Sequence, residues 1–139
     1  METNALDKIL VDTSAWIEFF RKKEPWYSAI SGLMDERRVC CSGIILAELI
    51  QGAKSQKELE VLRDFRHVFE FLDESVDLWQ AAGELSNTLE RKGRSVGLSD
   101  CYLAASAKAH KARILTLDKH FDIIKGAVSI GLYEVKAER

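Results

Sequence analysis

The segment Ile9-Leu10-Val11-Asp12-Thr13-Ser14-Ala15-Trp16 contains the pattern that best indicates the fold class. Its first three residues are aliphatic, which is typical of a buried strand in a parallel sheet. Residues 13–21 then show apolar residues at helical spacing, so a helix is predicted directly after the strand. The segment therefore predicts a strand–helix unit with the carboxylate of Asp12 at the carboxyl end of the strand.

The rest of the chain repeats this alternation of short apolar runs and helical patterns. Further strands are predicted at residues 39–41, 68–72, 114–117 and within 128–135. Helices are predicted at residues 26–35, 43–53, 55–66, from 75 onward, and 99–110. This order favours an α/β protein, a three-layer α/β/α fold with a central, mostly parallel sheet. The 139 residues contain no evident linker or repeat and fit a single domain, residues 1–139.

Composition and charge limit the possible function classes. The formal net charge is −2, so any attraction to nucleic acid has to come from local basic residues or a bound metal. No apolar run approaches the ~20 residues of a membrane-spanning helix, and residues 1–8 do not resemble a signal peptide. A cytoplasmic protein without membrane contact is expected. Cys40, Cys41 and Cys101 show no metal-ligand spacing and are predicted to be buried, reduced thiols.

Two acidic residues follow predicted strands at the same edge of the sheet. Asp12 comes after the first strand and Asp118 after the fourth, and ligands bind outside the carboxyl ends of such strands. Each also has a structural explanation. Asp12 is suited to cap the next helix, although the two hydroxyl residues after it can do so as well. Asp118 is suited to cap the residues that follow it or to pair with Lys119 or His120.

Two further acidic residues lie in predicted helices. Asp100 is in the first turn of its helix, where the backbone dipole favours a negative charge and explains the residue adequately. Glu48 lies in the strongly apolar run Ile44-Ile45-Leu46-Ala47-Glu48-Leu49-Ile50. Either it occupies a narrow solvent-facing stripe or it is functional. The second interpretation is favoured, because burying an unpaired ion costs several kcal/mol.

The four carboxylates together predict a divalent-metal site. Unit charges about 4 Å apart repel by about 4 kcal/mol at an effective dielectric constant of 20, and a bound cation removes that cost. Mg²⁺ or Mn²⁺ suits a site made of oxygen ligands. Zinc is not expected, because no set of His and Cys ligands is evident.

Four segments resemble the PIN domain and, within it, the VapC-like toxins of toxin–antitoxin pairs. Each motif is short, but the four occur in family order and span nearly the whole chain. The segments are Ile9-Leu-Val-Asp-Thr-Ser-Ala-Trp16, Ile45-Leu-Ala-Glu-Leu-Ile-Gln-Gly52, Gly97-Leu-Ser-Asp-Cys-Tyr-Leu-Ala-Ala105 and Leu115-Thr-Leu-Asp-Lys-His-Phe121.

The resemblance implies a sheet with strand order 3-2-1-4-5 and Mg²⁺- or Mn²⁺-dependent cleavage of RNA that leaves a 5′-phosphate and a 3′-hydroxyl. His120 matches a position where some relatives have a further acid, which argues against a second permanently bound metal. The acidic metal-binding set that it implies is Asp12, Glu48, Asp100 and Asp118. The hydroxyl residues that it implies, which orient carboxylates or phosphate, are Thr13 or Ser14, and Thr116. Basic residues near these segments are candidate phosphate contacts: Arg21, Lys22, Lys23, Lys92, Arg94 and Lys119.

The resemblance also implies partners. VapC-like proteins usually form homodimers and are inhibited by a small antitoxin protein that lies in an apolar groove near the site. Core packing is the favoured interpretation for most of the aromatic residues that are candidates for such a groove. These candidates are Trp16, Phe19, Phe20, Trp26 and Tyr27.

Other functions fit the sequence less well. An aspartyl-phosphate phosphatase has its nucleophile at the end of the first strand, but it needs a second Asp two residues later, and Ser14 is there. A phosphoacceptor signalling domain needs a Lys after the last strand and a paired early acid, and neither is evident. An inert PIN-like module that only binds RNA or a partner also remains open, although an unused acid cluster costs stability.

Overall fold

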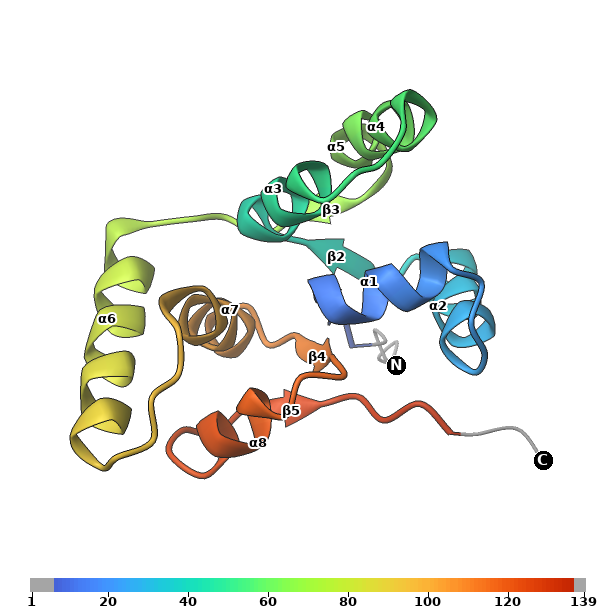
Figure 1. The fold of residues 1–139 in the computed structure, drawn as a ribbon. Coiled ribbons are helices and arrows are strands. Elements are labelled where there is room, and N and C mark those ends of the chain that lie inside the picture. The colour runs from blue at the N-terminus through green and yellow to red at the C-terminus, as the bar shows by residue number, and fades with distance from the viewer. Residues whose placement is uncertain (1–6, 137–139) are drawn as a thin grey trace, which may run out of the picture.

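A computed structural model describes residues 7–136 and shows a five-stranded sheet in which all neighbouring strands are parallel (Figure 1). The strand order β3-β2-β1-β4-β5 confirms the predicted order. The strands are β1 (Ile9–Val11), β2 (Val39–Cys41), β3 (Glu70–Phe71), β4 (Arg113–Leu115) and β5 (Gly131–Leu132).

Helices cover both faces of the sheet and complete the predicted three layers. Because parallel crossovers are right-handed, connections that step toward β3 and connections that step toward β5 lie on opposite faces. The helices of the first group, together on one side of the sheet in Figure 1, are α1 (Thr13–Phe20), α2 (Trp26–Asp35), α3 (Gly43–Gln51), α4 (Gln56–Arg63) and α5 (Phe65–Val68). Those of the second group are α6 (Val76–Arg91), α7 (Leu98–Ala109) and α8 (His120–Lys125).

The helix that follows β1 is held by a cluster of aromatic side chains. Trp16 is 1% exposed, and its ring lies 4.9 Å from Phe65 and 5.5 Å from Phe69 between ring centroids. Phe19 and Phe20 complete the cluster at 5.3 Å and 5.8 Å from the same ring. This packing joins α1 to the segment between α4 and β3, and it fixes the position of the residues that precede α1.

The third strand is shorter than predicted. Residues 68–72 were expected to form it, but Val68 ends α5 and only Glu70 and Phe71 pair with β2. The prediction was wrong at Val68 because the contacts of Phe65 and Phe69 with Trp16 favour a helical turn, in which the Phe69 N–H donates to the Phe65 carbonyl at 2.9 Å. The predicted helix at 55–66 likewise divides at Asp64 into α4 and α5.

The three cysteines are buried and unbonded, as predicted. Cys40 and Cys41 point to opposite sides of β2, and both are inaccessible because helices cover both faces. Burial raises the pKa of each of these thiols to about 12, so both are protonated at neutral pH. Within residues 7–136 there is no helix of the length and apolar character needed to cross a membrane.

Candidate active site

The centre of the sheet brings together the two segments that carry Asp12 and Asp118. β1 and β4 are neighbours, with Val11 opposite Leu115, and the Asp12 N–H donates to the Leu115 carbonyl at 3.1 Å. The connections after these two strands lead to helices on opposite faces. The point where strand order reverses is where open α/β sheets form their binding crevice.

Asp12 is held in place by three hydrogen-bond donors. The Ser14 hydroxyl donates to its Oδ1 at 2.7 Å, the Ala15 N–H donates to the same oxygen at 3.2 Å, and the Thr116 hydroxyl donates to Oδ2 at 2.5 Å. The pKa of Asp12 is raised above its usual value, mainly by burial and also by the negative charge of Asp100, while the three donors act in the opposite direction. Asp12 therefore caps α1, and the argument that its neighbours make it unnecessary as a cap was wrong. The hydroxyl of Ser14 supports the carboxylate instead.

The segment after β4 leaves the sheet earlier than predicted. The strand was expected to reach residue 117, but it ends at Leu115, and Asp118 lies three residues beyond it. The next backbone groups bond to side chains instead of a neighbouring strand: the Leu117 N–H donates to Ser14 Oγ and the Asp118 N–H donates to Thr116 Oγ1, both at 2.9 Å. The two hydroxyls that orient Asp12 thus also shape the turn that carries Asp118.

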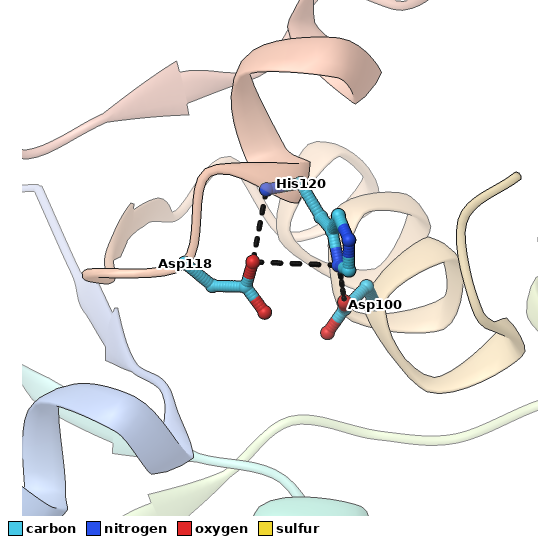
Figure 2. Close-up of side chains that lie close together, drawn as sticks. All are labelled: Asp100, Asp118 and His120. Atoms are coloured by element: carbon cyan, nitrogen blue, oxygen red, sulfur yellow. Dashed lines mark hydrogen bonds and ion pairs between the residues drawn. The ribbon is translucent and has the colours of Figure 1, made fainter. Parts of the chain in front are cut away.

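Asp100, Asp118 and His120 form the tightest group of possible ligands among residues 7–136 (Figure 2). One ligand atom from each lies within 4.8 Å of the others. His120 Nδ1 is 3.3 Å from Asp100 Oδ2 and 3.4 Å from Asp118 Oδ1. Burial and the negative charge of Asp118 raise the pKa of Asp100, His120 lowers it, and Glu48 raises it. Asp118 and Glu48 are therefore close enough to disfavour the ionised form of Asp100.

Glu48 belongs to the same neighbourhood but is not buried. The sequence predicted a carboxylate enclosed by apolar residues, whereas Glu48 is exposed on α3. The prediction was wrong because the solvent-facing side of α3 is wide and also includes Ala47, Ile50 and Gln51. The Thr13 hydroxyl donates to Glu48 Oε1 at 2.5 Å, which ties α3 to the first turn of α1. Glu48 acts on Asp100 through its charge.

A sequence profile of the PIN domain matches residues 9–127. The chain belongs to the PIN-domain family. VapC11 ribonuclease of Mycobacterium tuberculosis is 33% identical to it over 122 residues, 84% of this chain and 90% of that protein. A tRNA(fMet)-specific endonuclease VapC of Salmonella typhimurium is 30% identical over 124 residues, 86% of this chain and 93% of that one. This PIN domain is thus VapC-like, as its motifs predicted.

Solved structures confirm the fold of this PIN domain. A chain of the DNA-bound VapBC of Salmonella typhimurium superposes with a TM-score of 0.74 at 28% identity, covering 94% of this PIN domain and 100% of that chain. VapBC2 of Rickettsia felis, bound to a DNA fragment from its promoter, gives a TM-score of 0.70 at 24% identity, covering 90% and 96%.

The structure brings some of the predicted site residues of this PIN domain close together and others only within reach of their charge. Asp100 and Asp118 lie together, the charge of Glu48 acts on Asp100, and the charge of Asp100 acts on Asp12. The predicted hydroxyls contact the carboxylates. His120 is the group that the predicted ligand set left out. The sequence could have indicated His120 as a ligand, because it occupies a position where some relatives have a further acid. Lys119, between Asp118 and His120 in the sequence, is exposed. The other candidate phosphate contacts, which are also exposed, are Arg21, Lys22, Lys23, Lys92 and Arg94.

The residues present fit a divalent cation. Asp100 and Asp118 lie close enough for the charge of Asp118 to raise the pKa of Asp100, and Asp12 is held by three hydrogen-bond donors. Carboxylate oxygens of this kind suit Mg²⁺ or Mn²⁺. The expectation of oxygen ligands alone needs one change, because an imidazole nitrogen shares the site. One histidine does not make the His and Cys set that structural zinc sites use.

Proposed function

We propose that this protein is a Mg²⁺- or Mn²⁺-dependent endoribonuclease and the toxin of a toxin–antitoxin pair. The main support is the convergence of Asp12, Glu48, Asp100 and Asp118 at the point where strand order reverses. The VapC relatives of the same length and fold supply the reaction class, cleavage of an RNA phosphodiester bond.

Each side chain has a task that its contacts support. Asp100 and Asp118 would hold the cation, and Asp12, which follows β1 and is kept in one orientation by Ser14 and Thr116, would contribute to the same site. Glu48 orients the attacking water or contacts the cation through water. A cation bound there would supply a water of lowered pKa and would polarise the phosphate that is cut.

The phosphatase alternative loses support from the geometry of Asp12. A nucleophilic carboxylate needs a free oxygen within reach of phosphorus. Asp12 is 4% exposed, and both of its oxygens accept hydrogen bonds. Ser14, at the position where the phosphatase needs its acid, donates to Asp12 and cannot serve as that acid.

Cleavage is expected to depend on added metal. Incubation with structured RNA and Mg²⁺ or Mn²⁺ should give fragments with 5′-phosphate ends, while a chelator should reduce the rate by at least about 10³-fold, because the water and the phosphate then lose their activating charge. The measurement is gel separation of end-labelled RNA, with end-group analysis. Cleavage that persists in chelator would overturn the proposed mechanism. Calorimetric Mn²⁺ titration without binding at millimolar metal would favour the inert module.

A groove beside the site, lined by an apolar part and by the charged residues Arg21, Glu48, Lys54 and Glu58, supports an antitoxin as partner. The groove has a volume of about 410 Å³ and lies between α1, α3 and α4. Of the aromatic candidates, Trp16 is buried in the core, and Phe19, Trp26 and Tyr27 are half-buried. Phe20, 40% exposed, is the one that lines the groove. The other apolar residues that line it are Ile17, Leu49, Ala53 and Leu62.

The groove also contains residues of the site, so its occupant can inhibit cleavage. Thr13 and Glu48 both line it. Solved relatives such as VapBC-5 of Mycobacterium tuberculosis are described as members of toxin–antitoxin systems, which supports the same kind of partner here. The homodimer that the family resemblance implies stays a prediction.

Replacing Phe20 with glutamate is expected to weaken antitoxin binding on the order of tenfold or more, because a charge would enter the apolar part of the groove. The measurement is calorimetric titration with a candidate antitoxin, the product of a short reading frame adjacent to the gene if the genome contains one. Val68→Glu is the matched control, since Val68 is 64% exposed and does not line the groove. Equal affinity of the Phe20 and Val68 variants would place the antitoxin elsewhere.

A further inference from the structure

His120 occupies a position in the acidic site that a metal ligand would occupy. It is the first residue of α8, and its backbone N–H donates to Asp118 Oδ1 at 2.9 Å. Its ring turns back over the site, so that Nδ1 faces Asp100 and Asp118 together (Figure 2). The histidine is thus fixed at its backbone by one of the two acids that its ring contacts.

The distances between these donor atoms match neighbouring ligands of one cation. In an octahedral site with metal–ligand distances of about 2.1 Å, adjacent ligand atoms are separated by about 3.0 Å. His120 Nδ1 is 3.3 Å from Asp100 Oδ2 and 3.4 Å from Asp118 Oδ1. A small inward shift of exposed or half-buried side chains brings all three atoms to a common cation. The neutral ring with its proton on Nε2 presents the Nδ1 lone pair that ligation requires.

We propose that His120 is a direct metal ligand through Nδ1, and that this nitrogen makes the site select Mn²⁺ over Mg²⁺. Mg²⁺ is a hard cation bound by oxygen, whereas imidazole is a ligand for transition metals. The inference rests on the proposed metal-dependent function and adds the identity of one ligand and of the preferred cation.

The other histidines are distinguishable from His120 and serve as internal controls. The chain has three histidines. His67 is exposed on α5. His110 follows the last residue of α7, at the opposite end of that helix from Asp100, and its Nδ1 lies 2.9 Å from the Ser106 carbonyl oxygen. Neither belongs to the group of close ligand atoms. A magnetic signal from a histidine nitrogen bound to the metal can therefore be assigned to one of the three histidines by substituting each in turn.

The test is pulsed electron paramagnetic resonance of the full protein loaded with Mn²⁺ below one equivalent. Direct ligation predicts ¹⁴N modulation of the Mn²⁺ signal in the wild-type protein. The modulation should disappear in His120→Gln, which retains only an oxygen ligand at this position, and persist in His67→Gln. Circular dichroism melts of both variants establish that they fold like the wild-type protein.

Affinities test the preference for Mn²⁺. His120→Gln should lower Mn²⁺ affinity by at least about tenfold while changing Mg²⁺ affinity by less than about threefold. His120→Asp, which supplies an oxygen at the same place, should bind both cations without ¹⁴N modulation and with a lower ratio of Mn²⁺ to Mg²⁺ affinity. Calorimetric titration gives all of these values.

The possible failures are distinct. If Mn²⁺ binds the wild-type protein without ¹⁴N modulation, or if the modulation survives in His120→Gln, the assignment of His120 as a ligand is overturned while metal-dependent cleavage stands. If neither Mn²⁺ nor Mg²⁺ binds the wild-type protein, the proposed metal-dependent function fails and the assignment fails with it.

Discussion

Asp100→Asn is expected to lower the rate of RNA cleavage by at least about 10²-fold while the protein stays folded, because the variant loses one of the two closely spaced carboxylates. Asp100 is a cleaner target than Asp12. Both oxygens of Asp12 accept hydrogen bonds, so an asparagine amide there would face a donor and disturb the fold as well. Asp100 has one such contact, with His120.

The same substitution is expected to raise the melting temperature of the metal-free protein. Burial and the negative charges of Asp118 and Glu48 raise the pKa of Asp100. A raised carboxyl pKa gives stability that is fully present below the unfolded value of about 3.9 and is lost as the pH rises through the folded value. At neutral pH the ionised carboxylate therefore costs free energy, and asparagine removes that cost.

Single-turnover cleavage and thermal melts in chelator are the two measurements for Asp100→Asn. Asp77→Asn is the matched control, because Asp77 is an exposed acid in the first turn of α6, as Asp100 is in the first turn of α7. Full cleavage by a folded Asp100→Asn protein would remove Asp100 from the mechanism. A lower melting temperature in chelator would show that the contact between Asp100 and His120 outweighs the repulsion.

Trp16→Ala is expected to reduce the free energy of unfolding by about 3–5 kcal/mol, the largest effect expected for a residue outside the acidic site. Trp16 is 1% exposed and contacts four aromatic rings, each pair adding about 0.5–1.5 kcal/mol beyond its buried area. Because its side chain also positions α1, the variant should lose cleavage activity as it loses structure.

Urea unfolding of two further variants separates the possible causes. Phe20→Ala removes a ring from the same cluster, but Phe20 is 40% exposed, so a loss of only about 1–2 kcal/mol is expected. Trp16→Phe should cost less than Trp16→Ala, because it keeps an aromatic ring and removes the buried indole N–H, which has no hydrogen-bond partner. A Trp16→Ala protein as stable as Phe20→Ala would contradict this role for the cluster.

The sequence predicted the sheet well where side chains alone decide the structure. The apolar runs at Ile9–Val11 and Val39–Cys41 are buried on both faces, so the composition of these segments is enough to predict the strands. Strand ends were predicted less well. The local pattern predicts that β4 continues to Leu117, but the Leu117 N–H donates to the hydroxyl of Ser14, which is 103 residues away in the sequence. A local pattern contains no information about such a partner.

The site shows the same limit. Asp12, Asp100 and Asp118 were predicted as site residues because they follow strands or begin helices, and the structure places Asp100 and Asp118 together. Glu48 was chosen for the wrong physical reason, since the wide exposed side of α3, which includes Glu48 and Ile50, depends on how that helix packs. The place of His120 beside two acids depends on a turn that only the three-dimensional structure shows.

The pairing of β4 with β1 has a consequence for the synthesis of the protein. The hydroxyl of Thr116 reaches Asp12 across 104 residues of sequence, and Asp118 and His120 come later still. A nascent chain on the ribosome therefore lacks Asp118, His120 and the Thr116 contact to Asp12 until the residues after β4 have emerged and β4 has paired with β1. We therefore expect the site to assemble late in synthesis, when the carboxyl-terminal part of the chain joins the sheet.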